Sequence, residues 1–124
     1  MKPVTHDDIV SWVEKINKKF GRSNNGWTVR WIELLISRGA KAELHDDWYV
    51  VYIICPDAWG DTQLAIMSCD SDNVGAFCAM QHRIEQIAKD AGVKYILQGS
   101  ELDDKYNDYL VRSGYRAQTF RKEV

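Results

Sequence analysis

Residues 68–77, SCDSDNVGAF, join the end of an apolar segment to the start of a helical pattern. The first turn of a helix leaves backbone N–H groups unpaired, and its dipole favours an anion. This junction is therefore a candidate phosphate site in which backbone donors would hold the ligand. A structural interpretation stays open beside it: Asp72 or Asn73 caps the helix, which is worth about 1 kcal/mol, and Gly75 relieves crowding.

Two acidic residues, each just after an apolar segment, are candidate proton acceptors. Asp70 follows the apolar segment TQLAIMSC, and Glu101 follows the segment VKYILQG. Each could act as a general base, or could be a solvated loop acid. Together with Asp103 and Asp104 they would make this edge acidic, which suits a cation better than a nucleotide.

Two tyrosines, Tyr106 and Tyr109, lie on a short helical pattern near the C-terminus. A phenolic hydroxyl can in general act as a proton donor. The alternative is a core aromatic ring whose hydroxyl reaches the rim of the core.

Cysteine and histidine also occur together, but their arrangement favours neither nucleophilic catalysis nor a metal. Cys78 and His82 share one face of a helical pattern with Glu85, whereas a nucleophile and its base normally come from separate elements held in a cleft. A zinc site built from Cys55, Cys69, Cys78 and His82 would lack the short ligand spacings of structural sites. We therefore expect no metal cofactor.

The composition of the chain indicates its number of domains, its partners and its location. The chain has 124 residues, 45% of them apolar, which suits one domain spanning residues 1–124 with one core. Its net charge of −2 disfavours nucleic acid as a partner. Because no signal-like start and no long apolar stretch occur, we expect no membrane contact and a cytoplasmic location. Three unpaired cysteines fit a reducing compartment.

Hydrophobic periodicity predicts the elements that must position these residues. The predicted helices are residues 5–21, 27–39, 73–92 and 103–114. The predicted strands are residues 41–46, 48–56, 62–69, 93–99 and 115–123. In the third helix the expected inward stripe is Phe77, Met80, Ile84, Ile87, Ala88 and Ala91. The first three strands should pair as antiparallel hairpins, and the fourth should run parallel to the third.

This order, α-α-β-β-β-α-β-α-β, resembles the GNAT superfamily of N-acetyltransferases over roughly residues 5–122. The local match is YLVRSGYR, which is similar to the family's aromatic-rich fourth helix with its Gly-aromatic end. The resemblance implies an α+β (α/β) domain whose mixed, mostly antiparallel sheet is flanked by helices. In length and general sequence character the chain looks most similar to short GNAT-like proteins of tailed bacteriophages.

The resemblance implies that acetyl-CoA enters between the strands TQLAIMSC and VKYILQG, with its pyrophosphate on the following helix start. The implied cofactor-binding residues are Cys69, Ser71, Asn73, Val74, Gly75, Ala76 and Phe77. The family motif is degenerate here, because Asp72 stands at its amide or basic position and Phe77 at its last small one. The family's tyrosine falls on Leu110, which leaves Tyr109 as the candidate acid beside Asp70 and Glu101.

Two functions follow from this resemblance. One is an acyltransferase that moves an acetyl group from acetyl-CoA to an amine of a small molecule or protein. The other is an inactive GNAT-fold binding protein, such as a phage accessory or virion protein, acting through protein contacts. Trp27 and Trp59 stand beside turn residues and are candidate contact residues for a protein partner. A phage-encoded protein would act in the host cytoplasm or the virion.

Overall fold

The computed structural model of the chain describes residues 4–21, 25–98 and 104–116, with the backbone alone at positions 20, 25, 27 and 104–106. Helices and strands follow one another in the order α1-α2-β1-β2-β3-α3-β4-α4. This order matches the predicted one up to α4. The predicted last strand, residues 115–123, lies almost entirely outside the described residues.

Two helices, α1 (His6–Phe20) and α2 (Asn25–Ser37), precede the sheet. A capping box starts α1, in which the Thr5 hydroxyl accepts from the N–H of Asp8 and the Asp8 carboxylate accepts from the N–H of Thr5. Gly21 ends α1 with a positive φ of 69°, a conformation that favours glycine. α2 begins two residues earlier than the periodicity predicts.

The sheet contains β1 (Lys41–Leu44), β2 (Trp48–Pro56), β3 (Thr62–Ser71) and β4 (Tyr95–Leu97), paired in that order. β1, β2 and β3 are antiparallel neighbours, and β4 lies parallel to β3. These pairings confirm the predicted topology. α3 (Val74–Ala91) connects β3 to β4, and α4 (Asp104–Arg112) follows β4.

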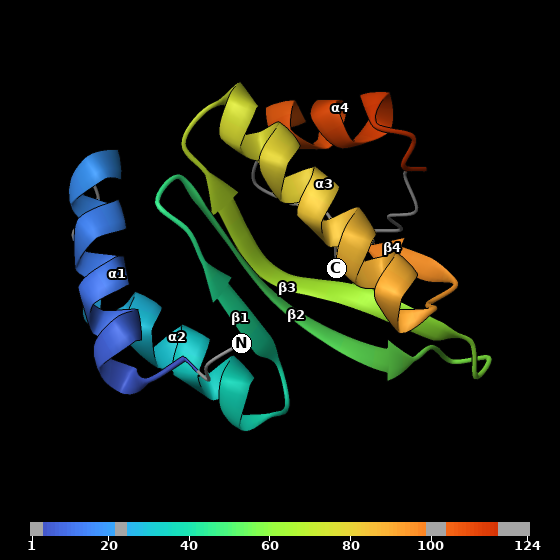
Figure 1. The fold of residues 1–124 in the computed structure, drawn as a ribbon, viewed down its shortest axis with the longest axis horizontal. Helices are drawn as coiled ribbons and strands as arrows, with labels where there is room; N and C mark the ends of the chain where they lie inside the picture. Colours follow the sequence, from blue (N-terminus) through green and yellow to red (C-terminus); the bar gives the residue numbers. More distant parts are fainter. Residues whose placement is uncertain (1–3, 22–24, 99–103, 117–124) are drawn as a thin grey trace, which may run out of the picture.

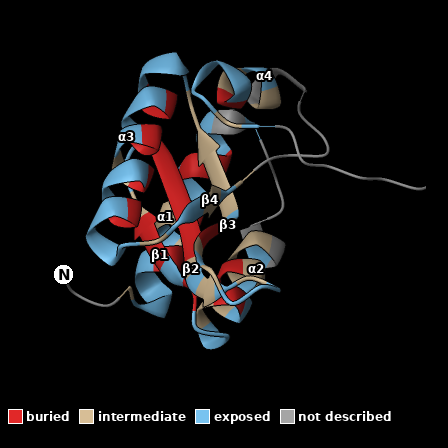
Figure 2. Cartoon of the chain, turned by 90° about the vertical axis from the view of Figure 1, so that its right-hand side faces the viewer, coloured by how far each residue is buried: buried red, intermediate tan, exposed pale blue. Residues whose placement is uncertain are grey.

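Each face of the sheet carries its own apolar cluster. Figure 1 shows α1 and α2 on one side of the strands and α3 and α4 on the other. The α1–α2 side is packed with Ile9, Val13, Ile32, Leu35, Ala42, Tyr49 and Val51, among others. The α3–α4 side is packed with Trp48, Val50, Tyr52, Leu64, Phe77, Met80, Ile84 and Leu110, among others. Figure 2 shows this burial along the strands and along the inner face of α3.

The predicted inward stripe of α3 is correct except at its last position. Phe77, Met80, Ile84, Ile87 and Ala88 are buried. Ala91 is exposed, because the helix ends at Gly92 beyond the edge of the apolar cluster. The alternation between buried and exposed residues therefore stops one turn before the predicted end.

Candidate functional site

The parallel pairing of β3 and β4 is short and ends six residues before the end of β3. It covers three residue pairs and stops at Ala65 and Leu97, whereas β3 continues to Ser71. Beyond Ala65, β3 has no partner on this side among the described residues. A bulge lies in this stretch, since Val51 pairs with Ser68 and Tyr52 with Ile66, which leaves Met67 unmatched. Because a bulge bends and twists its strand, β3 changes direction just past its last pair with β4.

The N-terminus of α3 follows directly from the end of β3. Asn73 is the N-cap, and its Oδ1 atom accepts from the N–H of Ala76 at 2.9 Å. The N–H of Phe77 donates to the carbonyl of Asn73. The N–H groups of Val74 and Gly75 are the first two of the helix and have no hydrogen-bond acceptor in the described part of the chain. Two backbone donors are thus available at the predicted phosphate position.

Asp72 is not an isolated negative charge at this position. Its N–H donates to the carbonyl of Asp47, and its carboxylate lies 2.6 Å from the Nζ atom of Lys19 on α1. The same Nζ atom lies 2.8 Å from the carboxylate of Asp47. The hydrogen bonds that Lys19 donates to Asp47 and then to Asp72 raise the pKa of Lys19 to about 12. A lysine that is distant in sequence therefore supplies a cation beside the α3 start.

Side chains of α3 and α4 pack against one another on the α3–α4 side of the sheet. Phe77 is buried, and its ring centroid lies 5.4 Å from that of Tyr109. Leu110, the neighbour of Tyr109 on α4, is only 4% exposed and belongs to the core. The Tyr109 ring is partly buried, and the guanidinium of Arg112 lies 6.0 Å from its centroid. Tyr109 therefore packs at the edge of the α3–α4 apolar cluster.

A polar network that sequence reasoning missed closes the end of β4. Gln98 donates from Nε2 to the Tyr115 hydroxyl at 2.6 Å and to Oε1 of Gln81 at 2.8 Å. Gln81 on α3 is buried. Burial raises the pKa of Tyr115, although the hydrogen bond from Gln98 opposes that rise. Nothing in the local sequence indicates this network, since its members belong to three separate segments.

The predicted acids are not brought together on one face. Cys69 packs against the α3–α4 cluster, and the Ser68 hydroxyl lies 2.8 Å from that of Tyr49 on the α1–α2 side. By alternation Asp70 faces the α1–α2 side, whereas Tyr109 lies on the α3–α4 side. Any chemistry shared by them must occur through the gap beside β3. Glu101 lies outside the described residues.

The remaining sequence candidates are dispersed over the surface. Cys78 and His82 are both exposed on α3. Within the described ranges, no three histidine, cysteine or acidic side chains converge as metal ligands, and no described helix is long and apolar enough to span a bilayer. Trp59 is 88% exposed at the β2–β3 turn. The side chain of Trp27 lies outside the described residues.

Comparison with known proteins agrees on the fold. No family model matches the chain, and no curated protein matches it. A structure from Pyrococcus furiosus whose name refers to an acetyl transferase aligns with a TM-score of 0.69 at 21% identity, over 95% of this chain and 91% of that one. A transcriptional regulator from Bacillus halodurans aligns at 0.69 and 12% identity, over 99% and 96%.

A third structure, from Clostridium acetobutylicum, is described as an acetyltransferase with acetyl-CoA. It aligns with a TM-score of 0.60 at 12% identity, over 97% of this chain and 91% of that one. At such identities the similarity shows the fold and not the activity. The chain therefore has a GNAT-like α+β fold, as the sequence predicts.

Proposed function

We propose that this protein is an acetyl-CoA-dependent acyltransferase that acetylates an amine of a small molecule or protein. The observation that carries the proposal is the parting of β3 from β4 after Ala65. β3 then runs without this partner to the α3 N-terminus, where the N–H groups of Val74 and Gly75 are available. The likeness to acetyltransferase structures across nearly the whole chain supports it. The donors available suit the pyrophosphate of acetyl-CoA, because helix N-termini bind anions.

The side chains around these donors determine the charge and the lining of the proposed anion site. The Lys19 ammonium offsets the negative charge of Asp72. Cys69 and Ser71 flank the approach along β3, and Ala76 and Phe77 form the first inward turn of α3. The pyrophosphate would thus be held by backbone N–H groups with a cation from α1 nearby.

Acetyl-CoA would supply an activated acetyl group and a thiolate leaving group. In this proposal Asp70 would accept the proton that the acceptor amine loses as it forms the new amide bond. Tyr109 would donate its hydroxyl proton to the departing sulfur. The two residues would therefore act from opposite faces of the sheet, Asp70 from the α1–α2 side and Tyr109 from the α3–α4 side.

Thermal unfolding with and without acetyl-CoA tests the proposal. Acetyl-CoA at 100 times its dissociation constant should add about 2.7 kcal/mol of stability and raise the melting temperature by several degrees. S-acetylpantetheine, which lacks the pyrophosphate, should give a much smaller rise. Release of free thiol with a panel of primary amines then tests transfer. If millimolar acetyl-CoA leaves the melting temperature unchanged, the proposal is wrong.

A charge variant at the helix start sharpens this test. Val74 is 54% exposed at the first position of α3. Val74→Glu places a negative charge where it favours the helix dipole but repels a pyrophosphate. The variant should fold as well as the parent and bind acetyl-CoA about tenfold more weakly, given the usual size of a close like-charge repulsion. The matched control Val74→Gln should bind like the parent.

A second candidate function rests on a different observation. The Asn73 side chain already accepts from the N–H of Ala76. Trp59 is exposed on a turn in which Asp57 accepts from the N–H groups of Trp59 and Asp61. A protein that uses this fold to bind another protein through Trp59 would need no cofactor. An unchanged melting temperature with acetyl-CoA, together with a partner whose binding Trp59→Ala abolishes, would favour this function.

A further inference from the structure

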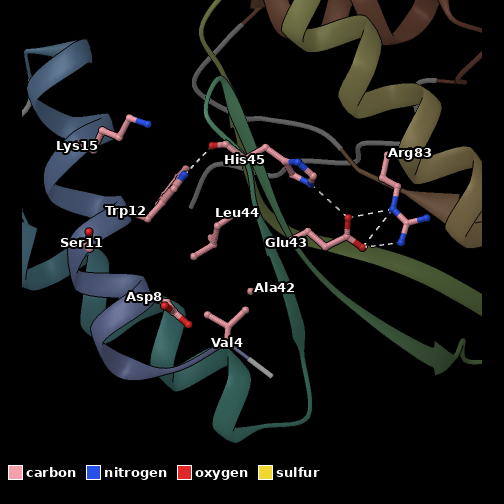
Figure 3. Close-up of a pocket in the computed structure, with 10 residues that line it drawn as sticks. All are labelled: Val4, Asp8, Ser11, Trp12, Lys15, Ala42, Glu43, Leu44, His45 and Arg83. Carbon is pink, nitrogen blue, oxygen red and sulfur yellow. Dashed lines mark hydrogen bonds and ion pairs between the residues drawn. The ribbon is translucent and has the colours of Figure 1, made fainter. Parts of the chain in front are cut away.

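The outer edge of β1 forms the floor of a groove on the side of the molecule away from β4. The groove has a volume of about 650 Å³ and lies between α1 and Arg83 of α3. Figure 3 shows Ala42 and Leu44 on the α1 side of β1, and Glu43 and His45 on the side of Arg83. This volume is within the range typical of ligand sites.

The register of the β1–β2 hairpin determines which backbone groups face this groove. The N–H of His45 donates to the carbonyl of Trp48, so these two residues form a hydrogen-bonded pair. Pairing alternates in an antiparallel ladder, so Glu43 also bonds to β2, whereas Ala42 and Leu44 direct their N–H and C=O groups outwards. Among the described residues, nothing bonds these outward groups. β1 is thus an edge with open donors and acceptors.

The two walls of the groove differ in chemistry. On the α1 side, Val4, Trp12 and Leu44 provide apolar surface, and the indole Nε1–H of Trp12 donates to the carbonyl of His45 at 2.7 Å. The same wall also carries the polar side chains of Asp8, Ser11 and Lys15. On the other side, Glu43 accepts from the Nε and Nη2 atoms of Arg83 at 2.9 and 2.8 Å.

The polar wall retains a donor for a further carboxylate. The Nη1 amino group of Arg83 has no hydrogen-bond partner in the described part of the chain, and the Arg83 side chain is 30% exposed. The charges of Glu43 and Arg83 offset each other, and His45 stacks on Trp48 at 3.8 Å between ring centroids. The Nε2 atom of His45 also lies 3.4 Å from the Glu43 carboxylate. An acidic group entering here would meet the Nη1 donor of Arg83 without displacing these pairs.

We propose that this groove binds an extended peptide of a partner protein as an added antiparallel strand on β1. Only an extended chain presents N–H and C=O groups at the spacing of Ala42 and Leu44. Alternation then dictates the peptide's side chains, because neighbouring residues point to opposite walls. The peptide carries apolar residues towards Trp12 and Leu44 and acidic residues towards Arg83 and His45.

The test uses the capped pentapeptide acetyl-Val-Glu-Val-Glu-Val-amide and two N-methylated forms. In an antiparallel pair, residues opposite Ala42 and Leu44 have side chains on the α1 side, so their valine N–H groups bond to β1. N-methylation of the valines should weaken binding at least tenfold, and N-methylation of the glutamates should leave it within about twofold. The amide resonances of Ala42 and Leu44 should shift on titration.

Variants of the protein complete the test. Ser11→Trp places a ring in the groove and should abolish binding, whereas Glu14→Trp, also on the exposed surface of α1, should not. If Ser11→Trp folds poorly, Arg83→Lys keeps a positive charge beside Glu43 but loses Nη1. This variant should bind the glutamate-containing pentapeptide at least fivefold more weakly. It should bind the same peptide with glutamine in place of glutamate as tightly as the parent does.

Three results would overturn the proposal. One is the absence of binding at millimolar pentapeptide, and another is equal tolerance of both N-methylated forms. The third is a concentration-dependent dimer that shifts the same Ala42 and Leu44 amides without peptide, which would assign this edge to a second copy of the chain.

Discussion

The Nζ atom of Lys19 lies 2.6 Å from Oδ2 of Asp72, so the last turn of α1 is joined to the residue before the N-cap of α3. The sequence places Asp72 where a basic or amide side chain would favour a phosphate. The structure brings a cation to that place from another helix. The candidate anion site is therefore less negative than its local sequence indicates.

The first prediction concerns this ion pair. Lys19→Gln leaves the carboxylates of Asp47 and Asp72 without a cation. The dissociation constant for acetyl-CoA should rise about fivefold at low salt, and less at high salt, because added salt screens exposed charges. Isothermal titration measures it. Lys15→Gln, which removes the more exposed pair with Asp46, is the control, and an equal rise in both variants would contradict the prediction.

The second prediction separates capping from anion binding. Asn73→Ala removes the acceptor for the Ala76 N–H and should cost about 1 kcal/mol of unfolding free energy. Asn73→Asp should keep the cap. Because the alanine variant frees the Ala76 N–H, its acetyl-CoA affinity should not fall, whereas Asn73→Asp should bind more weakly. Denaturant unfolding and calorimetric titration measure the two effects; a parallel loss of stability and affinity in the alanine variant would refute the separation.

The third prediction tests the Tyr109 hydroxyl. Tyr109→Phe keeps the contact with Phe77 and removes the proton donor. Turnover should fall about a hundredfold, the lower range for general acid catalysis, while acetyl-CoA affinity stays unchanged. Steady-state kinetics with an amine acceptor distinguishes the two parameters. Unchanged turnover would remove Tyr109 from the reaction.

The fourth prediction concerns the neighbouring position. Leu110 is 4% exposed, so Leu110→Tyr would overfill the core and bury a hydroxyl. We expect a loss of about 1–3 kcal/mol in unfolding free energy, and no gain in turnover from restoring the family's tyrosine. Val111→Tyr is the control, because Val111 is 56% exposed on the same helix, and it should change stability little. A stable, more active Leu110→Tyr variant would contradict this account.

The fifth prediction concerns pH and the Glu43–Arg83 pair. Burial alone would raise the pKa of Glu43, but the hydrogen bonds and charge of Arg83 outweigh it and hold the pKa below 4.5. The pair therefore stabilises the fold above about pH 4.5, and this stabilisation disappears as pH falls through the lowered pKa of the folded state. Glu43→Gln should cost about 1–3 kcal/mol at pH 7 and progressively less towards pH 3.

Urea unfolding of the parent protein and of Glu43→Gln between pH 3 and pH 7 tests this pH dependence. Asp46→Asn, which breaks an exposed ion pair with Lys15, should cost less than about 1 kcal/mol across the range. If the loss of unfolding free energy in Glu43→Gln grew as pH fell, the prediction would be wrong.

Much of the scaffold could be predicted from residues close together in sequence. The α1 boundaries at Thr5 and Gly21 follow from a cap and a glycine stop, and α3 follows from its apolar stripe. The change to strand-forming residues after Gly39 predicts the hairpins, and the helix between β3 and β4 predicts their parallel pairing. Each of these features depends on interactions within a few residues or on one chain crossover.

The candidate site depended more on tertiary structure. The sequence alone determined where an anion-binding helix start could stand, and offered Asp72 and Asn73 equally as its cap. Packing decided between them, because the Asp72 carboxylate is engaged by Lys19 and the Asn73 side chain is left to bond Ala76. The bond from Gln98 to Tyr115 and the Glu43–Arg83 pair were likewise decided by packing. Local patterns record periodicity and caps, whereas these contacts exist only once distant segments share one side of a folded sheet.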